Sequence, residues 1–226
     1  MASTSHSQRY HKIEAIGEGT YGRVYKARCV GTSELVAIKR LFPSQEEEGL
    51  GATTIREIAI LKELSHPNII KLKDVLFQLP KLTLVFELCK FDLKRCMLTS
   101  PSPLSPETVC SYTHQMLLGI LCMHERSISH RDLKPQNLLV SDDLTTIKIC
   151  DFGLARVETI PIKKYSHEAV TLWYRPPDVI LGSANYGLAV DIWSAGCIFG
   201  EMLAGQAIFQ GRNEAEQLQR MFKLLG

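Results

Sequence analysis

The chain has 226 residues, of which 45% are hydrophobic and 22% are charged, and its formal net charge at pH 7 is +2. This length allows one large domain or two lobes with a sizeable core, and the composition is ordinary for a soluble globular protein. The small net charge argues against nucleic acid as a partner, and no stretch approaches the ~20 apolar residues that span a membrane.

Residues 1–9 are polar and serine-rich without the apolar run of a signal peptide, and we expect them to be disordered. The seven cysteines are odd in number and form no CxxC pair, which favours reduced thiols over disulfides or a zinc site. A cytoplasmic or nuclear protein that does not bind a membrane is therefore expected.

A glycine-rich segment lies within residues 10–31, whose alternation is typical of β-strands. It reads Gly17-Glu18-Gly19-Thr20-Tyr21-Gly22-Arg23-Val24, a G-x-G-x-x-G-x-V pattern in which glycines let backbone amides approach a polyphosphate. A Rossmann phosphate turn is the alternative, but it requires a helix after the turn. Residues 24–27 continue as β-like sequence, which favours a hairpin loop over the phosphates.

Residues 35–39, Leu-Val-Ala-Ile-Lys, form a short apolar strand ending in Lys39, which alone could be a solvated end residue. A helix is predicted from about residue 53 to residue 64, with Glu57, Leu61 and Leu64 on one face. A carboxylate on an inward face needs a cation, so we expect Lys39 to pair with Glu57 and to reach the α- and β-phosphates. The outward face carries Ile55, where a partner could dock.

Pro67-Asn68 ends this helix, and residues 69–76 and 82–88 are predicted to be buried strands that lead into a polar turn at 90–92. Ser105-Pro106 is a favourable N-cap and first-turn pair for the next helix. The predicted buried stripe of that helix comprises Val109, Tyr112, Met116, Leu117 and Ile120.

The segment at residues 130–137 reads His-Arg-Asp-Leu-Lys-Pro-Gln-Asn and concentrates groups suited to phosphoryl transfer. Asp132 can orient and deprotonate an attacking hydroxyl, Lys134 can steady the migrating phosphoryl group, and Asn137 can hold a magnesium ion. A charged surface turn is the alternative, which the three other motifs around this segment disfavour.

A predicted hairpin of residues 138–140 and 147–149 ends at Asp151-Phe152-Gly153 and would return Asp151 to the side of Asn137. A carboxylate and an amide supply the oxygen ligands that Mg²⁺ prefers. We therefore expect Asn137 and Asp151 to hold the metal while Asp132 handles the nucleophile.

The order H-R-D-L-x-x-x-N, with the other motifs, resembles eukaryotic protein kinases. More narrowly, from Tyr10 to the last residue the chain is similar to the cyclin-dependent kinases. Residues 51–57 correspond to the cyclin-binding helix of that family, and residues 165–178 to its activation and substrate-docking segment. With a serine at 166 and an aspartate at 178, this segment is most similar to that of cyclin-dependent kinase five and its close relatives. Glycine and alanine at 51 and 52 depart from the proline and serine that are usual in the family. Val157-Glu158 likewise replaces the family's pair of a small and an aromatic residue.

The resemblance implies an α+β, two-lobed kinase fold with a β-rich N-lobe at 10–88 and a mainly helical C-lobe at 89–226. The C-lobe would lack the last helices of the family, so we expect residues 1–226 alone to be unstable and weakly active. The implied activity is transfer of the ATP γ-phosphoryl group to Ser or Thr before proline, with Mg²⁺ and a cyclin or cyclin-like activator on the Ile55 face. The alternative is an inactive fragment that only binds partners, although Lys39, Asp132 and Asp151 are all present.

The resemblance also assigns nucleotide-binding roles. The phosphate loop would use Gly17, Glu18, Gly19 and Gly22, and Glu87 and Cys89 would bind adenine through their backbones. Asp92 and Gln136 would lie near the ribose. The apolar residues around adenine would be Ile16, Val24, Ala37, Phe86 and Leu139.

Further roles follow from the same likeness. Thr171 would contact the catalytic aspartate and lysine, and Val170 with Arg175 would favour proline after the phosphoacceptor. Inhibitory phosphorylation is expected at Thr20 and Tyr21. The phosphate of the activation-segment site, Ser166, would be bound by Arg56, Arg131 and Arg156. Asp191 is expected to cap a helix at 192–203 and to anchor the catalytic loop, and the helix at 214–225 to carry an apolar stripe of Ala215, Leu218, Phe222 and Leu225.

Overall fold

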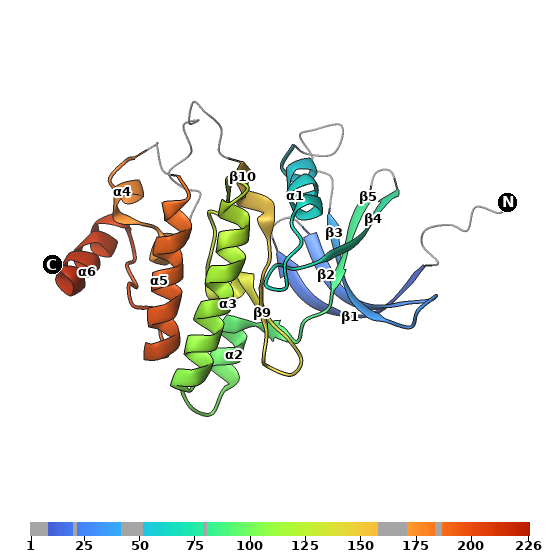
Figure 1. Cartoon of the computed structure of the whole chain (residues 1–226), viewed down its shortest axis with the longest axis horizontal. Helices are drawn as coiled ribbons and strands as arrows, with labels where there is room; N and C mark the ends of the chain where they lie inside the picture. Colours follow the sequence, from blue (N-terminus) through green and yellow to red (C-terminus); the bar gives the residue numbers. More distant parts are fainter. Residues whose placement is uncertain (1–8, 20–21, 42–51, 79–80, 158–170, 184–186) are drawn as a thin grey trace. The chain divides into compact units, whose positions relative to one another are not determined.

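The computed structural model describes residues 9–19, 22–41, 52–78, 81–157, 171–183 and 187–226, and the chain forms two compact units (Figure 1). One unit comprises the residues up to Ser65 together with Ile70–Cys89. The other comprises His66–Ile69 together with Lys90–Gly226. The first unit is mainly strands and the second mainly helices, as the predicted α+β class requires.

In its described residues the first unit is a five-stranded antiparallel sheet in the order β1-β2-β3-β5-β4, with one helix, α1 (Ala52–Glu63). The predicted hairpin of the glycine-rich segment is confirmed, because β1 pairs with β2 from Tyr10↔Cys29 to Gly19↔Gly22. Gly22 has a φ of +155°, and a Cβ there would overlap the Arg40 carbonyl oxygen, so only glycine fits. The strands are β1 (Tyr10–Gly19), β2 (Gly22–Cys29), β3 (Leu35–Leu41), β4 (Leu72–Gln78) and β5 (Lys81–Glu87).

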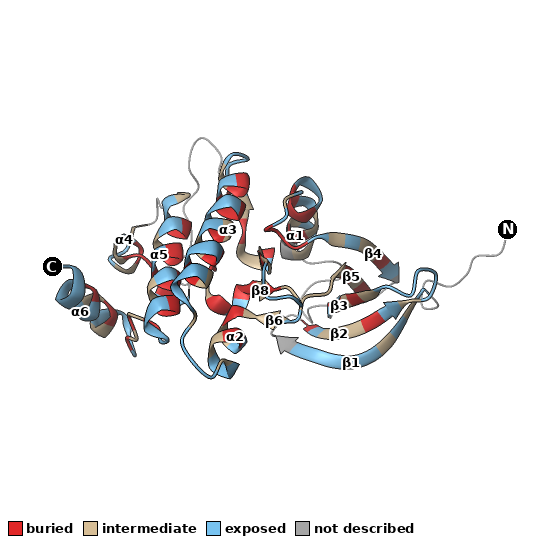
Figure 2. Cartoon of the chain, turned by 60° about the horizontal axis from the view of Figure 1, so that its bottom comes forward, coloured by how far each residue is buried: buried red, intermediate tan, exposed pale blue. Residues whose placement is uncertain are grey.

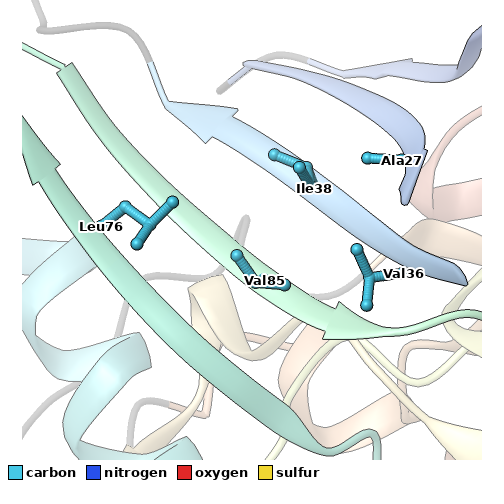
Figure 3. Close-up of a cluster of buried hydrophobic side chains, with 5 residues drawn as sticks. All are labelled: Ala27, Val36, Ile38, Leu76 and Val85. Atoms are coloured by element: carbon cyan, nitrogen blue, oxygen red, sulfur yellow. The ribbon is translucent and has the colours of Figure 1, made fainter. Parts of the chain in front are cut away.

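Alternation along β3 divides the apolar side chains of this unit between the two faces of the sheet. One face carries a buried cluster with Tyr10 packed against it, and the cluster comprises Ala27, Val36, Ile38, Leu76 and Val85 (Figure 3). The other face carries Leu41, Leu82 and Leu84, against which Ile58 of α1 packs. On α1 the predicted inward residues Glu57 and Leu61 are buried, as is Leu64 directly after the helix, and Ile55 is 55% exposed.

The second unit contains five helices and several short elements among its described residues. The helices are α2 (Leu93–Thr99), α3 (Pro106–His124), α4 (Pro177–Ile180), α5 (Ala189–Ala204) and α6 (Glu214–Leu225). The short strands are β6 (Phe91–Asp92), β7 (Ile128–Ser129), β8 (Leu138–Val140), β9 (Ile147–Ile149) and β10 (Arg156–Val157). They form a sheet β6-β8-β9 and a pair β7–β10, so the predicted hairpin of 138–149 is confirmed. Three 3₁₀ turns complete it: η2 (Pro135–Asn137), η3 (Phe152–Leu154) and η5 (Leu172–Tyr174).

Helix α3 begins at the predicted cap, where the Ser105 hydroxyl accepts a hydrogen bond from the Thr108 amide at 3.2 Å. Four of the five predicted core residues are buried, and the prediction was wrong for Leu117, which is 43% exposed. Leu117 directly follows Met116, and a step of one residue turns the side chain about 100° away from the buried stripe. No helix in the described part of the chain has the length and apolarity needed to cross a bilayer.

One helix prediction in the C-terminal part requires correction. Helix α5 begins at Ala189, so Asp191 lies within its first turn and is not its N-cap; the N-cap is Leu188. Helix α6 has the predicted bounds and carries the predicted apolar stripe. This stripe is largely exposed, with Phe222 at 56% and Leu225 at 63%. Most of α6 is exposed (Figure 2), and its buried residues are Gln217 and Met221.

The segment His66–Ile69 belongs to the second unit, although the residues before and after it in the sequence belong to the first. The Asn68 carbonyl accepts from the Ile149 amide at 2.8 Å, and the Asn68 side chain donates to the Ile147 carbonyl at 2.9 Å. These bonds fix the end of β9, from which the chain enters the candidate site.

Candidate active site

The loop at residues 130–137 is held by a buried carboxylate on α5. Asp191 is fully buried and accepts hydrogen bonds from the amides of His130 and Arg131, both at 2.8 Å. It also pairs with His124 Nε2 at the end of α3, at 2.9 Å. The expectation that Asp191 supports this loop therefore holds in the geometry, although the capping role does not.

His130 links this loop to the segment after β9. Its ring Nε2 donates to the Cys150 carbonyl at 2.9 Å, and its Nδ1 accepts from the Asp132 amide at 3.3 Å. The ring also meets Phe152 edge-on with centroids 5.1 Å apart. Both the loop and the segment that carries Asp151 are thus attached to one buried side chain.

Two non-glycine residues at this site have left-handed backbones, Arg131 with φ 68° and Asp151 with φ 62°. Such conformations cost about 1–3 kcal/mol each and persist only where surrounding contacts impose them. The Asp191 contacts to the Arg131 amide are a restraint of this kind. Strain beside a buried polar cluster is typical of functional sites.

The Asp132 carboxylate is bound by three side chains. Its Oδ2 accepts from Lys134 Nζ at 2.7 Å and from Asn137 Nδ2 at 3.0 Å, and its Oδ1 accepts from the Thr171 hydroxyl at 2.8 Å. Lys134 also donates to the Thr171 hydroxyl at 3.2 Å. These four predicted residues therefore form one network that fixes the orientation of a carboxylate beside an ammonium group.

Asn137 and Asp151 are brought near each other by the β8–β9 hairpin. The Asn137 carbonyl accepts from the Cys150 amide at 2.9 Å, and Asp151 follows as an exposed residue. Asn137 Nδ2 also donates to the Asp132 carbonyl at 2.7 Å, which leaves its amide oxygen as the atom it can offer a cation. An amide oxygen and a carboxylate fit the preference of Mg²⁺ for oxygen ligands.

In the first unit, Lys39 Nζ lies 2.8 Å from Glu57 Oε1, and the two side chains are 18% and 5% exposed. The strand registers Val24↔Lys39 and Ala37↔Phe86 place these residues on one face of the sheet, because Ala37 and Lys39 are two positions apart. Four predicted nucleotide residues therefore share the face that carries the ion pair.

The remaining nucleotide candidates are divided between the two units. At the end of β1, Gly17 lies opposite Val24 and Glu18 opposite Arg23, and Ile16 is 45% exposed. Glu87 and Cys89, after β5, are partly buried. In the second unit Asp92 lies opposite Leu139, and its Oδ1 caps α2 by accepting from the Arg95 amide at 2.8 Å. Gln136 is exposed on η2.

The predicted regulatory residues are only partly described. Thr20, Tyr21, Ser166 and Val170 lie outside the described residues. Arg56 belongs to α1 of the first unit.

The other two predicted phosphate-binding arginines belong to the second unit. There Arg156 lies opposite Ser129 in the β7–β10 pair. Ser129 is two residues before the buried Arg131. The chain thus brings two of the three predicted phosphate-binding arginines into one region.

Sequence reasoning missed a buried network behind η5. The fully buried Glu201 of α5 accepts from Lys94 of α2 and from the Tyr174 hydroxyl, both at 2.7 Å. Burial and the bond to Glu201 raise the pKa of Tyr174. The spacing of Asp191, Ser194, Ile198 and Glu201 on one helical stripe is the sequence signal that could have identified Glu201 as buried.

Arg175, which directly follows η5, is also paired. Its Nη1 lies 2.7 Å from Glu214 at the start of α6, and the guanidinium is largely buried. The pair borders an open depression of about 590 Å³ lined by Leu172, Arg175, Asn213, Glu214 and Ala215.

Comparisons of the sequence with known proteins place the chain in a family and beside a curated relative. The family described as "Protein kinase domain" matches residues 10–225. The curated protein "Cell division control protein 2 homolog 1" of Trypanosoma brucei brucei is 51% identical over 218 residues, which are 96% of this chain and 72% of that protein.

Proposed function

Because the chain belongs to the protein kinase family, and within it to the cyclin-dependent kinases, we propose that it transfers the γ-phosphoryl group of ATP to Ser or Thr residues followed by proline. The observation that carries the proposal is the network of Asp132, Lys134, Thr171 and Asn137.

In this proposal Asp132 orients the acceptor hydroxyl and receives its proton. Thr171 and Asn137 hold the carboxylate from its two oxygens, so it need not reorganise when the substrate arrives. The Lys134 ammonium, 2.7 Å from Asp132, lies where negative charge builds up during transfer. A positioned acid or base of this kind contributes about 10²- to 10⁴-fold to a reaction rate.

The nucleotide would be ATP with Mg²⁺. The Asn137 amide oxygen and the Asp151 carboxylate would hold the metal ion. The metal would neutralise charge on the phosphate oxygens. Lys39 is the cation for the α- and β-phosphates, and its bond to Glu57 keeps the long side chain extended. Gly22 lets the end of the phosphate loop lie close to β3, because a Cβ at this position would overlap the Arg40 carbonyl oxygen.

A cyclin-like activator would bind the outer face of α1, where Ile55 is 55% exposed and Ala59 and Lys62 are also exposed. The structure contains the Lys39–Glu57 pair. We infer that an activator on the outer face of α1 would favour the state of the protein in which this pair is formed.

Selection of proline after the phosphoacceptor would depend on the segment before Arg175. Proline has no N–H, so it leaves no donor unsatisfied at a position where the enzyme offers no acceptor. The closing test uses two peptides that differ only in Ser-Pro against Ser-Ala, with the activated chain, Mg²⁺ and ATP. We expect phosphate on the Ser-Pro peptide; equal transfer to both would refute proline selection, and transfer to neither would refute the kinase activity.

A further inference from the structure

Three Ser-Pro dipeptides lie within seven residues, from the end of α2 to the first residue of α3: Ser100-Pro101, Ser102-Pro103 and Ser105-Pro106. Residues 101–103 and 105–107 are exposed. A proline restricts the residue before it to extended conformations, and Ser100 and Ser105 have the corresponding ψ values of 133° and 150°. The segment therefore presents extended Ser-Pro units to solvent.

The three hydroxyl groups differ in what they already bind. Ser100 donates to the Ser102 carbonyl at 2.6 Å, and Ser105 caps α3 through the Thr108 amide. A phosphate on Ser105 would also face Glu107, whose pKa is lowered by its own backbone N–H and by the Ser105 hydroxyl. Among the described residues, the Ser102 hydroxyl has no hydrogen-bond partner, and residues 101–104 form no backbone–backbone hydrogen bond.

We propose that Ser102 is a phosphorylation site and that a second copy of this chain is the kinase that modifies it, an inference that rests on the proposed proline-directed activity. In the reaction, Ser102 Oγ bonds to the γ-phosphorus of ATP held by the other copy. The bond from that phosphorus to the β,γ-bridging oxygen breaks, and ADP leaves with this oxygen. The hydroxyl proton passes to Asp132 of the enzyme copy and then to water.

The reaction must occur between copies because α3 separates Ser102 from the catalytic loop of its own chain. Ser102 lies four residues before Pro106, the first residue of α3. The catalytic loop is instead linked through Asp191 to His124, the last residue of α3. A straight helix of 19 residues is about 27 Å long from first to last residue. Figure 1 shows the α2–α3 connection at one end of α3 and β10, the partner strand of β7, near the other.

The test uses the chain of residues 1–226 under the conditions in which the wild-type chain is assayed on the Ser-Pro peptide. An Asp132→Asn copy with a distinguishing tag serves as substrate for the wild-type copy, and mass spectrometry locates the phosphate. We expect phosphate on Ser102 of the tagged copy, at an initial rate proportional to the concentration of the wild-type copy. Ser102→Ala or Pro103→Ala in the tagged copy should remove it.

The two matched variants remove the acceptor and the motif separately, and neither residue takes part in a helix or a cap. Phosphorylation of the peptide without phosphate on Ser102 would overturn this inference and leave the proposed function standing. If neither the peptide nor Ser102 is phosphorylated, both this inference and the proposed function are overturned. Phosphate on Ser102 only after an unrelated proline-directed kinase is added would overturn the second copy as its enzyme.

Discussion

Replacing Lys94 by methionine should destabilise the second unit strongly, because it leaves a buried carboxylate without its cation. Lys94 Nζ lies 2.7 Å from Glu201 Oε1, and the two side chains are 26% and 0% exposed. Methionine is similar in length to the apolar part of lysine, so the change removes mainly the charge. Glu201 would keep its hydrogen bond from the Tyr174 hydroxyl but would lose the only cation that it contacts among the described residues.

Removing one member of a buried ion pair costs about 3–5 kcal/mol, and we expect the lower end because water reaches Lys94. For a protein of this size, about 3 kcal/mol corresponds to a fall of about 6–12 °C in Tm. Both tryptophans of the chain, Trp173 and Trp193, belong to the second unit, so their fluorescence reports its unfolding.

Two further variants make this measurement decisive. Arg220→Met removes an exposed cation from Glu216, which Arg212 also binds, and should barely move Tm. Glu201→Gln added to Lys94→Met should restore much of the loss, because an amide oxygen still accepts from Tyr174 and carries no charge. A Lys94→Met shift no larger than that of Arg220→Met, or no recovery in the double variant, would refute the reasoning.

Three other outcomes are expected. Ile55→Asp should abolish activation without changing ATP affinity, since Ile55 is exposed on α1; full activation of this variant by the same partner would contradict it. Ser166→Ala should reduce peptide phosphorylation less than Ile55→Asp does, and the reverse order would contradict the optional role of that phosphate. Burial, with Lys148 and Arg126 nearby, lowers the pKa of His66, so its contribution to stability is present above its ordinary pKa and lost as pH falls through the folded value. Fluorescence melts should therefore show a lower Tm at about pH 5.5 than at about pH 7.5. The same difference in Tm between the two pH values in His66→Gln would contradict the role of His66.

Features that depend on local periodicity could be predicted from the sequence. Helical spacing placed Glu57 with Leu61 and Leu64 on the buried face of α1, and the structure pairs it with Lys39 at 2.8 Å. The β8–β9 hairpin was equally predictable, because Leu-Leu-Val at 138–140 and Ile-Lys-Ile at 147–149 flank a polar turn. The position of Thr171 beside Asp132 followed only from the family resemblance, since 39 residues separate them.

Features set by tertiary contacts could not be predicted in this way. An aspartate before an apolar run is a capping signal, but Asp191 is buried to bind two loop amides and His124. On α6 the side chain of Gln217 is buried, and its amide oxygen accepts a hydrogen bond from the Gly211 backbone amide at 2.8 Å. A polar side chain is therefore buried on this helix while the apolar Phe222 is exposed. The Lys94–Glu201 pair spans 107 residues, so no local pattern connects its members.

The division of roles between two aspartates is the central claim and is tested most directly by comparing Asp132→Asn with Asp151→Asn. Each variant is measured for the affinity of ATP with Mg²⁺ and for the rate of peptide phosphorylation. Asp132→Asn should lower the rate by at least about 100-fold with ATP affinity unchanged, because its carboxylate handles the acceptor hydroxyl. Asp151→Asn should weaken binding of ATP with Mg²⁺. An equal loss of nucleotide affinity in both variants would contradict this account of the site.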